Sequence, residues 1–206
     1  MPRKAARKLP ALVFTRLVMA CLVIAGLAPV AGGATTVTRG GSTCTITGSS
    51  SGDNLNGTPG RDVICGMGGP DQLRGFGGND VLLGGNGGDF LRGGAGDDVA
   101  RGAADSDTMI GGGGDDRLFG GRGVDDGTGL GGDDLISGGG GPDTQLDSGP
   151  SGRDVVRGGS GNDACLATVD GVGNDTAVGG PGNDTAFTDP GDVRRSLERE
   201  RPCFAE

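Results

Sequence analysis

Apolar residues recur every nine positions between residues 48 and 187, within a frame of glycine and aspartate. Three successive units read GFGGNDVLL, GGNGGDFLR and GGAGDDVAR, over residues 75–101, and each fits G-G-x-G-x-D-x-U-x with U apolar. Insertions at 147–148 and 167–169 interrupt the frame, which otherwise gives fifteen units. The last three residues of each unit are predicted to form a short strand whose middle side chain points inward. The glycines before them predict a tight turn.

The predicted inward residues occupy the eighth position of the units. The first eight units place there Leu55, Ile64, Leu73, Leu82, Leu91, Ala100, Met109 and Leu118. Later units are weaker, with Gly127, Gln145, Cys165, Ala177 and Ala186 in the same position, which predicts looser packing after Leu118. These side chains are too few to balance the conformational entropy lost on ordering so glycine-rich a repeat.

The sixth position is aspartate in every unit. These residues are Asp53, Asp62, Asp71, Asp80, Asp89, Asp98, Asp107, Asp116, Asp125, Asp134, Asp143, Asp154, Asp163, Asp175 and Asp184. The pattern is typical of calcium-binding solenoids, and the chain resembles the RTX (repeats-in-toxin) family over about its middle two thirds. Calcium prefers six to eight oxygen ligands, which carboxylates and the carbonyls of glycine turns can supply. All fifteen aspartates are therefore candidate ligands for several calcium ions.

The resemblance implies an all-β fold, a parallel β-roll in which two nonapeptides make one coil. Calcium would then sit between turns that are 18 residues apart. One edge would carry the row from Asp53 to Asp143 and the other the row from Asp62 to Asp134, and the insertions leave the pairing beyond Asp143 open. About seven coils would form a rod of about 35 Å. Rows of carboxylates repel one another until a cation lies between them, so the calcium-free chain is predicted to be largely disordered.

Four segments are predicted: a signal peptide at 1–34, an N-terminal cap at 35–47, the repeats at 48–187 and a C-terminal cap at 188–206. The first segment has a basic start, an apolar run at 17–28 and a small-residue exit, as secretory signals have. A lipoprotein signal ending at Cys21 fits less well, because Arg16 interrupts the apolar stretch. The run is short for a membrane span, so no span is expected in the mature chain. The last segment gathers arginines, which favours a short helix or an irregular cap facing the acidic repeats, over a basic partner-binding patch.

The remaining four cysteines are even in number, which in an exported chain indicates disulfides. Three pairings are possible. We favour Cys44 with Cys65 and Cys165 with Cys203, because each would attach an end of the chain to the nearest repeats. The stretch 44–66 is also similar to secreted calcium-binding repeat proteins of actinobacteria, which implies the same first pair. Zinc binding is disfavoured by the absence of histidine and of C-x-x-C spacing.

Composition narrows the function further. The chain has no histidine, so the G-x-S-x-G match at residues 48–52 lacks the usual base of a catalytic triad, and an H-E-x-x-H protease motif is excluded. Without residues 1–34 the net charge is about −14, which disfavours nucleic acid. We therefore expect no enzyme but a secreted calcium-binding structural or adhesive module.

Three alternatives to this expectation stay open. The first is a calcium-triggered module that docks an unidentified extracellular protein or cell-surface partner. The second is a small secreted enzyme. The third is a disordered acidic linker without a fixed metal site.

Overall fold

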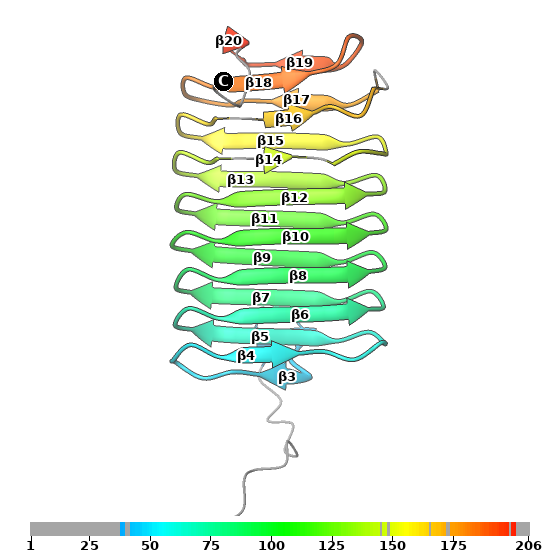
Figure 1. Cartoon of the computed structure of the whole chain (residues 1–206). Helices are drawn as coiled ribbons and strands as arrows, with labels where there is room; N and C mark the ends of the chain where they lie inside the picture. Colours follow the sequence, from blue (N-terminus) through cyan, green and yellow to red (C-terminus); the bar gives the residue numbers. More distant parts are fainter. Residues whose placement is uncertain are drawn as a thin grey trace, which may run out of the picture. The chain divides into compact units, whose positions relative to one another are not determined.

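The computed structural model describes residues 38–39, 42–144, 146–147, 149–164, 166–171, 174–197 and 199–200. The predicted signal peptide at 1–34 and the predicted bond between Cys165 and Cys203 lie outside the described residues. From residue 46 onward, short strands alternate between two parallel sheets, and each pair of successive strands closes one coil (Figure 1). This architecture is the parallel β-roll that the repeat predicts, and the described residues contain no helix.

The two sheets contain nine strands each. The odd sheet contains β3 (Ile46–Thr47), β5 (Val63–Gly68), β7 (Val81–Asn86), β9 (Val99–Ala104), β11 (Arg117–Arg122), β13 (Leu135–Gly140), β15 (Val155–Ser160), β17 (Thr176–Val178) and β19 (Val193–Arg195). The even sheet contains β4 (Asn54–Asn56), β6 (Gln72–Gly77), β8 (Phe90–Ala95), β10 (Thr108–Gly113), β12 (Asp126–Gly131), β14 (Leu146–Asp147), β16 (Leu166–Thr168), β18 (Thr185–Thr188) and β20 (Arg199–Glu200). Outside them, β1 (Thr38–Arg39) and β2 (Ser42–Thr43) pair antiparallel.

The roll is longer than the seven coils predicted from the repeat, because the ladder continues past both ends of the nonapeptide frame. At the start, β3 pairs in register with β5 through Ile46 and Ile64. At the end, β19 and β20 pair with β17 and β18. The described part of the C-terminal tail therefore extends the sheets as strands, where the sequence favoured a short helix or an irregular cap.

The core is a single column of side chains between the two sheets. It contains Ile64, Leu73, Leu82, Leu91, Ala100, Met109, Leu118, Ile136, Leu146, Val156, Leu166, Ala177 and Ala186, with Ile46, Leu55 and Leu197 packed against it. The predicted inward residues from Leu55 to Leu118 are confirmed as members of this column or as its partly buried neighbours.

The predicted small inward residues Gly127, Ala177 and Ala186 occupy the expected position, but the prediction is wrong for the units that contain Gln145 and Cys165. In β14 and β16 the inward position belongs to Leu146 and Leu166, one residue later than the predicted Gln145 and Cys165, which lie outside the described residues. The register shows the reason: Leu146 pairs with Gly127, 19 residues earlier, whereas the strands from β4 to β12 pair at a spacing of 18. One inserted residue lies before each leucine, so that a larger apolar side chain reaches the core.

The glycine at position 127 leaves no hole in the column. A Cβ added to Gly127 would lie 3.0 Å from Cγ2 of Ile136 and 3.6 Å from a methyl group of Leu146. The neighbouring coils therefore fill the space that the missing side chain leaves, and the core stays closed through the later units.

Candidate metal centre

The turns between the strands fold most of the aspartates back over the first glycine of their own units. A Cβ added to Gly66 would lie 2.2 Å from Oδ2 of Asp71, and the same holds at Gly75 and Asp80. The second and fourth positions take left-handed backbone in most turns, for example Gly85 (φ 122°) and Gly87 (φ 109°). The close approach of the carboxylate thus favours glycine at the first position, and the left-handed backbone favours glycine at the other two, although Met67 and Phe76 also adopt it at the second position.

Hydrogen bonds connect the aspartates of successive coils into two rows. In each step the backbone N–H of one aspartate donates to Oδ1 of the equivalent aspartate in the next coil, at 2.7–3.2 Å. The first row is Asp53, Asp71, Asp89, Asp107, Asp125, Asp143, Asp163 and Asp184. The second is Asp62, Asp80, Asp98, Asp116, Asp134, Asp154, Asp175 and Asp192. All fifteen predicted residues lie in these rows.

The insertions lengthen the step between coils without breaking the rows. The spacing rises from 18 to 20 residues between Asp143 and Asp163, and to 21 between Asp163 and Asp184. This settles the pairing that the sequence left open beyond Asp143. Asp192, which ends the second row, was not predicted from the sequence. It lies 17 positions after Asp175, one fewer than the usual 18, and directly before β19, and this near-period spacing could have identified it.

The second carboxylate oxygen of the interior aspartates is buried without a hydrogen-bond donor. Within the described residues this holds for Oδ2 of Asp71, Asp80, Asp89, Asp98, Asp107, Asp116, Asp125, Asp134, Asp143, Asp163 and Asp184. A buried ionised oxygen without a partner is costly, and a bound cation is the usual remedy. The turns thus present charged oxygens that the protein itself does not satisfy.

Backbone carbonyls lie near these oxygens: a Cβ added to Gly66 would lie 2.2 Å from Oδ2 of Asp71 and 2.7 Å from the carbonyl oxygen of Gly84. A Cβ on Gly85 would lie 2.4 Å from the carbonyl oxygen of Met67, and one on Gly87 would lie 2.6 Å from that of Gly69. Each carbonyl therefore points at the same turn position of the next coil. No group of three or more ligating side chains occurs among the described residues, so side chains alone cannot complete a coordination shell. Paired carboxylates with converging carbonyls suit a hard cation such as calcium.

Burial also shifts the acidity of the rows. Removal from water raises the pKa of Asp89, Asp98 and Asp134 to about 6, against a smaller lowering by the N–H donor of the preceding coil. The same cause raises the pKa of Asp107, Asp116 and Asp143 to about 7, with repulsion from neighbouring carboxylates adding to it. The pKa of Asp71, Asp80, Asp125, Asp163 and Asp175 is raised as well, mainly by burial. The ionised form of these carboxyl groups is therefore unfavourable in the folded protein at neutral pH.

The ends of the rows differ from the interior. Oδ2 of Asp53 accepts hydrogen bonds from the backbone N–H and hydroxyl of Ser49, at 2.6 and 2.8 Å. Thr58 serves Oδ2 of Asp62 in the same way, at 2.6 and 2.9 Å. Asp192 accepts from the hydroxyl of Thr168 at 3.0 Å. At these three row ends, protein donors thus occupy the oxygen that stays unsatisfied within the rows, whereas Oδ2 of Asp184, at the fourth end, has no donor among the described residues.

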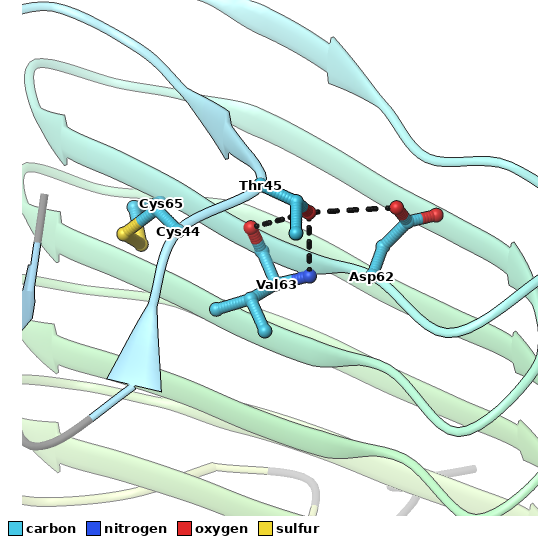
Figure 2. The surroundings of a disulfide bond; sticks show 5 residues. All are labelled: Cys44, Thr45, Asp62, Val63 and Cys65. Carbon is cyan, nitrogen blue, oxygen red and sulfur yellow. Dashed lines mark hydrogen bonds between the residues drawn. A yellow bond between two sulfur atoms is a disulfide. The ribbon is translucent and has the colours of Figure 1, made fainter. Parts of the chain in front are cut away.

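A disulfide closes the N-terminal end, as predicted. Cys44 and Cys65 are joined across a separation of 21 residues, with their Cα atoms 6.0 Å apart. Beside the bond, the Thr45 hydroxyl donates to the carbonyl of Val63 and accepts from its N–H, at 3.1 and 2.9 Å (Figure 2). Cys44 precedes Asp62 by 18 residues, so it takes the place of a row aspartate in the terminal coil.

Comparison with known proteins agrees with the geometry. The family described as RTX calcium-binding nonapeptide repeat (4 copies) matches residues 47–73, 56–91, 92–126, 128–144, 149–166 and 169–192. No curated protein matches the chain. No helix among the described residues is long and apolar enough to cross a membrane. The matched segments cover more than half of the chain and coincide with the coils that carry the rows, so the chain belongs to the RTX family of calcium-binding repeats.

Proposed function

We propose that this calcium-binding repeat module is secreted and that it serves as a structural or adhesive element outside the cell. The observation that carries the proposal is the pair of buried carboxylate rows, in which the second oxygen of most interior aspartates has no donor among the described residues. Calcium supplies the positive charge that these oxygens lack. Extracellular fluid holds enough of the ion for weak sites of about 10⁻⁴ to 10⁻³ M to fill.

The proposed ligands are the aspartates in the interior of the two rows, together with turn carbonyls. They hold several ions, because each gap between coils brings two carboxylates together on each edge. Asp53 and Asp62 stay predictions as ligands, since their second oxygens already accept two protein hydrogen bonds each. A non-catalytic role is part of the proposal, and the absence of histidine from the sequence supports it.

Calcium titration tests the proposal. Disulfide-intact protein comprising residues 35–206 is stripped of metal and titrated while far-UV circular dichroism is followed, with magnesium in parallel. We expect a cooperative gain of β signal at about 10⁻⁴ to 10⁻³ M calcium and none with magnesium. A spectrum that is already folded without metal, or that stays disordered in tenfold excess over this range, would refute metal-coupled folding.

A second candidate function is calcium-triggered docking of another secreted or surface protein. Apolar side chains on the outside of the roll favour it: Phe76 and Phe187 are about half exposed. Because calcium would order the strands that display these rings, a partner should be retained on the immobilised protein in calcium and released by a chelator. Retention that is equal in both conditions contradicts this role.

A further inference from the structure

A small cavity on the outer face of the even sheet brings together two arginines and an aromatic ring. Its volume is about 320 Å³, and it is lined by Arg74, Phe76, Arg92, Gly93, Gly94 and Ala95. These residues come from the neighbouring strands β6 and β8. The volume is at the lower end for ligand sites in proteins, which suits one ring-sized molecule.

The two arginines lie directly opposite each other. Arg74 and Arg92 are register partners in β6 and β8, and neighbouring strands are about 4.8 Å apart. Like charges in this arrangement are destabilising. Arg74 donates only to the Gln72 side chain, at 3.3 Å, and within the described residues neither guanidinium pairs with a carboxylate. Although the chain is acidic, these two adjacent guanidinium groups have no acidic partner, so a bound anion would relieve the repulsion between them.

The aromatic ring beside them is held in an unfavourable conformation. Phe76 is 56% exposed and has a φ of 76°, in a turn position where most units have glycine. A left-handed conformation is unfavourable for a non-glycine residue, because its Cβ comes too close to the backbone. The backbone of Phe76 therefore destabilises the roll, and its exposed ring adds nothing to the core in return. Its position in the wall of the cavity gives it a use as a flat apolar surface next to the guanidinium groups.

The cavity is also connected to the carboxylate rows. Gly93 and Gly94 begin the unit of Asp98, and Phe76 belongs to the unit of Asp80. A Cβ on Gly94 would lie 2.2 Å from the carbonyl oxygen of Phe76, and the Asp80 N–H donates to Asp98 at 2.7 Å. A cation held between these two carboxylates would order the cavity wall and cancel the negative charge behind it.

We infer that this cavity binds a carboxylate carried on a six-membered ring, and that it does so only when the roll is loaded with calcium. The two forked guanidinium groups receive the carboxylate, and the Phe76 ring covers one face of the ligand ring. A single charge fits best, because the net charge of about −14 outside residues 1–34 repels polyanions such as nucleic acid. The calcium dependence rests on the proposed function, whereas the binding chemistry rests on the cavity.

Calorimetric titration of the disulfide-intact, calcium-loaded protein tests the inference. The probes are glucuronate and benzoate, which carry the carboxylate on a sugar and on an aromatic ring, with glucose and inorganic phosphate as controls. At the efficiency usual for ligands, glucuronate would bind with a Kd of about 1 mM and the smaller benzoate with a Kd of about 10 mM. We expect one or both of the ring acids to bind in this range, and phosphate and glucose at least about tenfold more weakly.

Variants distinguish the cavity from general charge effects. Arg74→Gln and Arg92→Gln should each weaken binding at least about tenfold. Phe76→Gly should weaken binding while it stabilises the roll, because glycine accepts the positive φ. Arg101→Gln is the matched control: Arg101 also lies beside a phenylalanine, but on the odd sheet, where it stacks 5.1 Å from the Phe119 ring. Its binding should equal that of the unaltered protein.

Two results would overturn the inference: no heat from glucuronate at about 10 mM or from benzoate at about 100 mM, each tenfold above the expected Kd, or Arg92→Gln binding as tightly as the unaltered protein. Equal binding of phosphate and the ring acids would also overturn it, as it would show a general anion site. A calcium titration followed by circular dichroism accompanies each variant. Ring-acid binding to a protein that folds without calcium would refute the proposed metal-coupled folding and the calcium dependence, but leave the cavity chemistry standing.

Discussion

Replacing one buried aspartate by asparagine separates a calcium ligand from a merely structural residue. Asp107 is 2% exposed, and its Oδ1 accepts the Asp89 N–H at 2.8 Å, while its Oδ2 has no donor among the described residues. Asparagine has the same size and retains a carbonyl oxygen for the Asp89 N–H. Asp107→Asn therefore removes one negative charge from the two gaps that this residue borders and leaves the ladder in place.

The structure predicts that this substitution destabilises the calcium-loaded roll and stabilises the calcium-free roll. Contacts to a charged group are worth about 1.5–3 kcal/mol each, so the calcium-loaded roll should lose about 3 kcal/mol when both gaps are counted at the lower value. In the calcium-free roll, burial raises the pKa of Asp107 to about 7, so its charged form is unfavourable above neutral pH. The neutral amide removes this penalty, and the calcium-free state should gain β structure.

Urea denaturation followed by circular dichroism is the suitable assay. For about ten ions bound in one cooperative step, 3 kcal/mol shifts the calcium midpoint by less than twofold, which is hard to measure. The unfolding free energy in about 10 mM calcium, well above the expected affinity range, reports the loss directly. The calcium-free arm uses metal-stripped protein at about pH 8, above the raised pKa.

Asp115→Asn is the matched control. Asp115 is exposed and its Oδ1 accepts the Asp133 N–H at 2.9 Å, so the change in charge and the ladder contact are equivalent, but the carboxylate stays in water. Its effect should be small in both conditions. Equal destabilisation by Asp107→Asn with and without calcium, or no loss in calcium, would refute the assignment of the rows as metal ligands.

Four further predictions concern the rest of the roll. Acidifying metal-stripped protein from about pH 8 to pH 5 should increase its β signal, because raised carboxylate pKa values favour the folded state at low pH and this stability is lost as pH rises through about 7; an unchanged or falling signal contradicts the raised values. Thr58→Val should cost about 1 kcal/mol equally with and without calcium, since the hydroxyl serves Asp62 in place of metal; a calcium-dependent loss in urea unfolding argues against this. Cys44→Ser opens a 21-residue loop and should lower stability by about 3 kcal/mol, as thermal unfolding would show; an unchanged melting temperature argues against a role in stability. Leu91→Ala should cost about 2–5 kcal/mol in calcium, measured by urea unfolding, with exposed Phe187→Ala as the near-neutral control; equal losses would contradict the single-column core.

The sequence predicts the roll well wherever the nine-residue period is exact. Within residues 48–144 the inward position and the row position follow from counting alone, as Leu91 and Asp89 show. At the insertions the count no longer decides, because two extra residues can enter at several points of a coil. Packing decides instead: burying Leu146 rather than a glutamine gains hydrophobic free energy, so the bulge falls just before it. A search for the most apolar residue within one position of the expected slot would have found it.

The nine-residue period also does not distinguish two kinds of turn, because both have aspartate at the sixth position of the unit. In the first two units, Ser49 and Thr58 stand at the second position, without the left-handed backbone that Met67 takes at the same place in the third unit. Their amides and hydroxyls donate to Oδ2 of Asp53 and Asp62, whereas in most later turns that oxygen has no donor among the described residues. A hydroxyl residue at the second position is thus the sequence signal of a turn that satisfies its own carboxylate.

Because of this difference, the N-terminal coils should be more stable without calcium than the later coils. The terminal coil is closed by the Cys44–Cys65 bond, and the first two aspartates have protein donors, so the N-terminal end carries little of the charge repulsion that opposes folding elsewhere. The cost of the charged carboxylates begins at Asp71 and grows toward the middle of the rows, where burial, with a smaller contribution from repulsion, raises the pKa of Asp107 and Asp116 to about 7. Since each coil of a solenoid is stabilised by its neighbours, the ordered end can serve as a template. Calcium-dependent order should therefore spread from the disulfide toward the later coils, and hydrogen exchange at subsaturating calcium should protect β5 before β13.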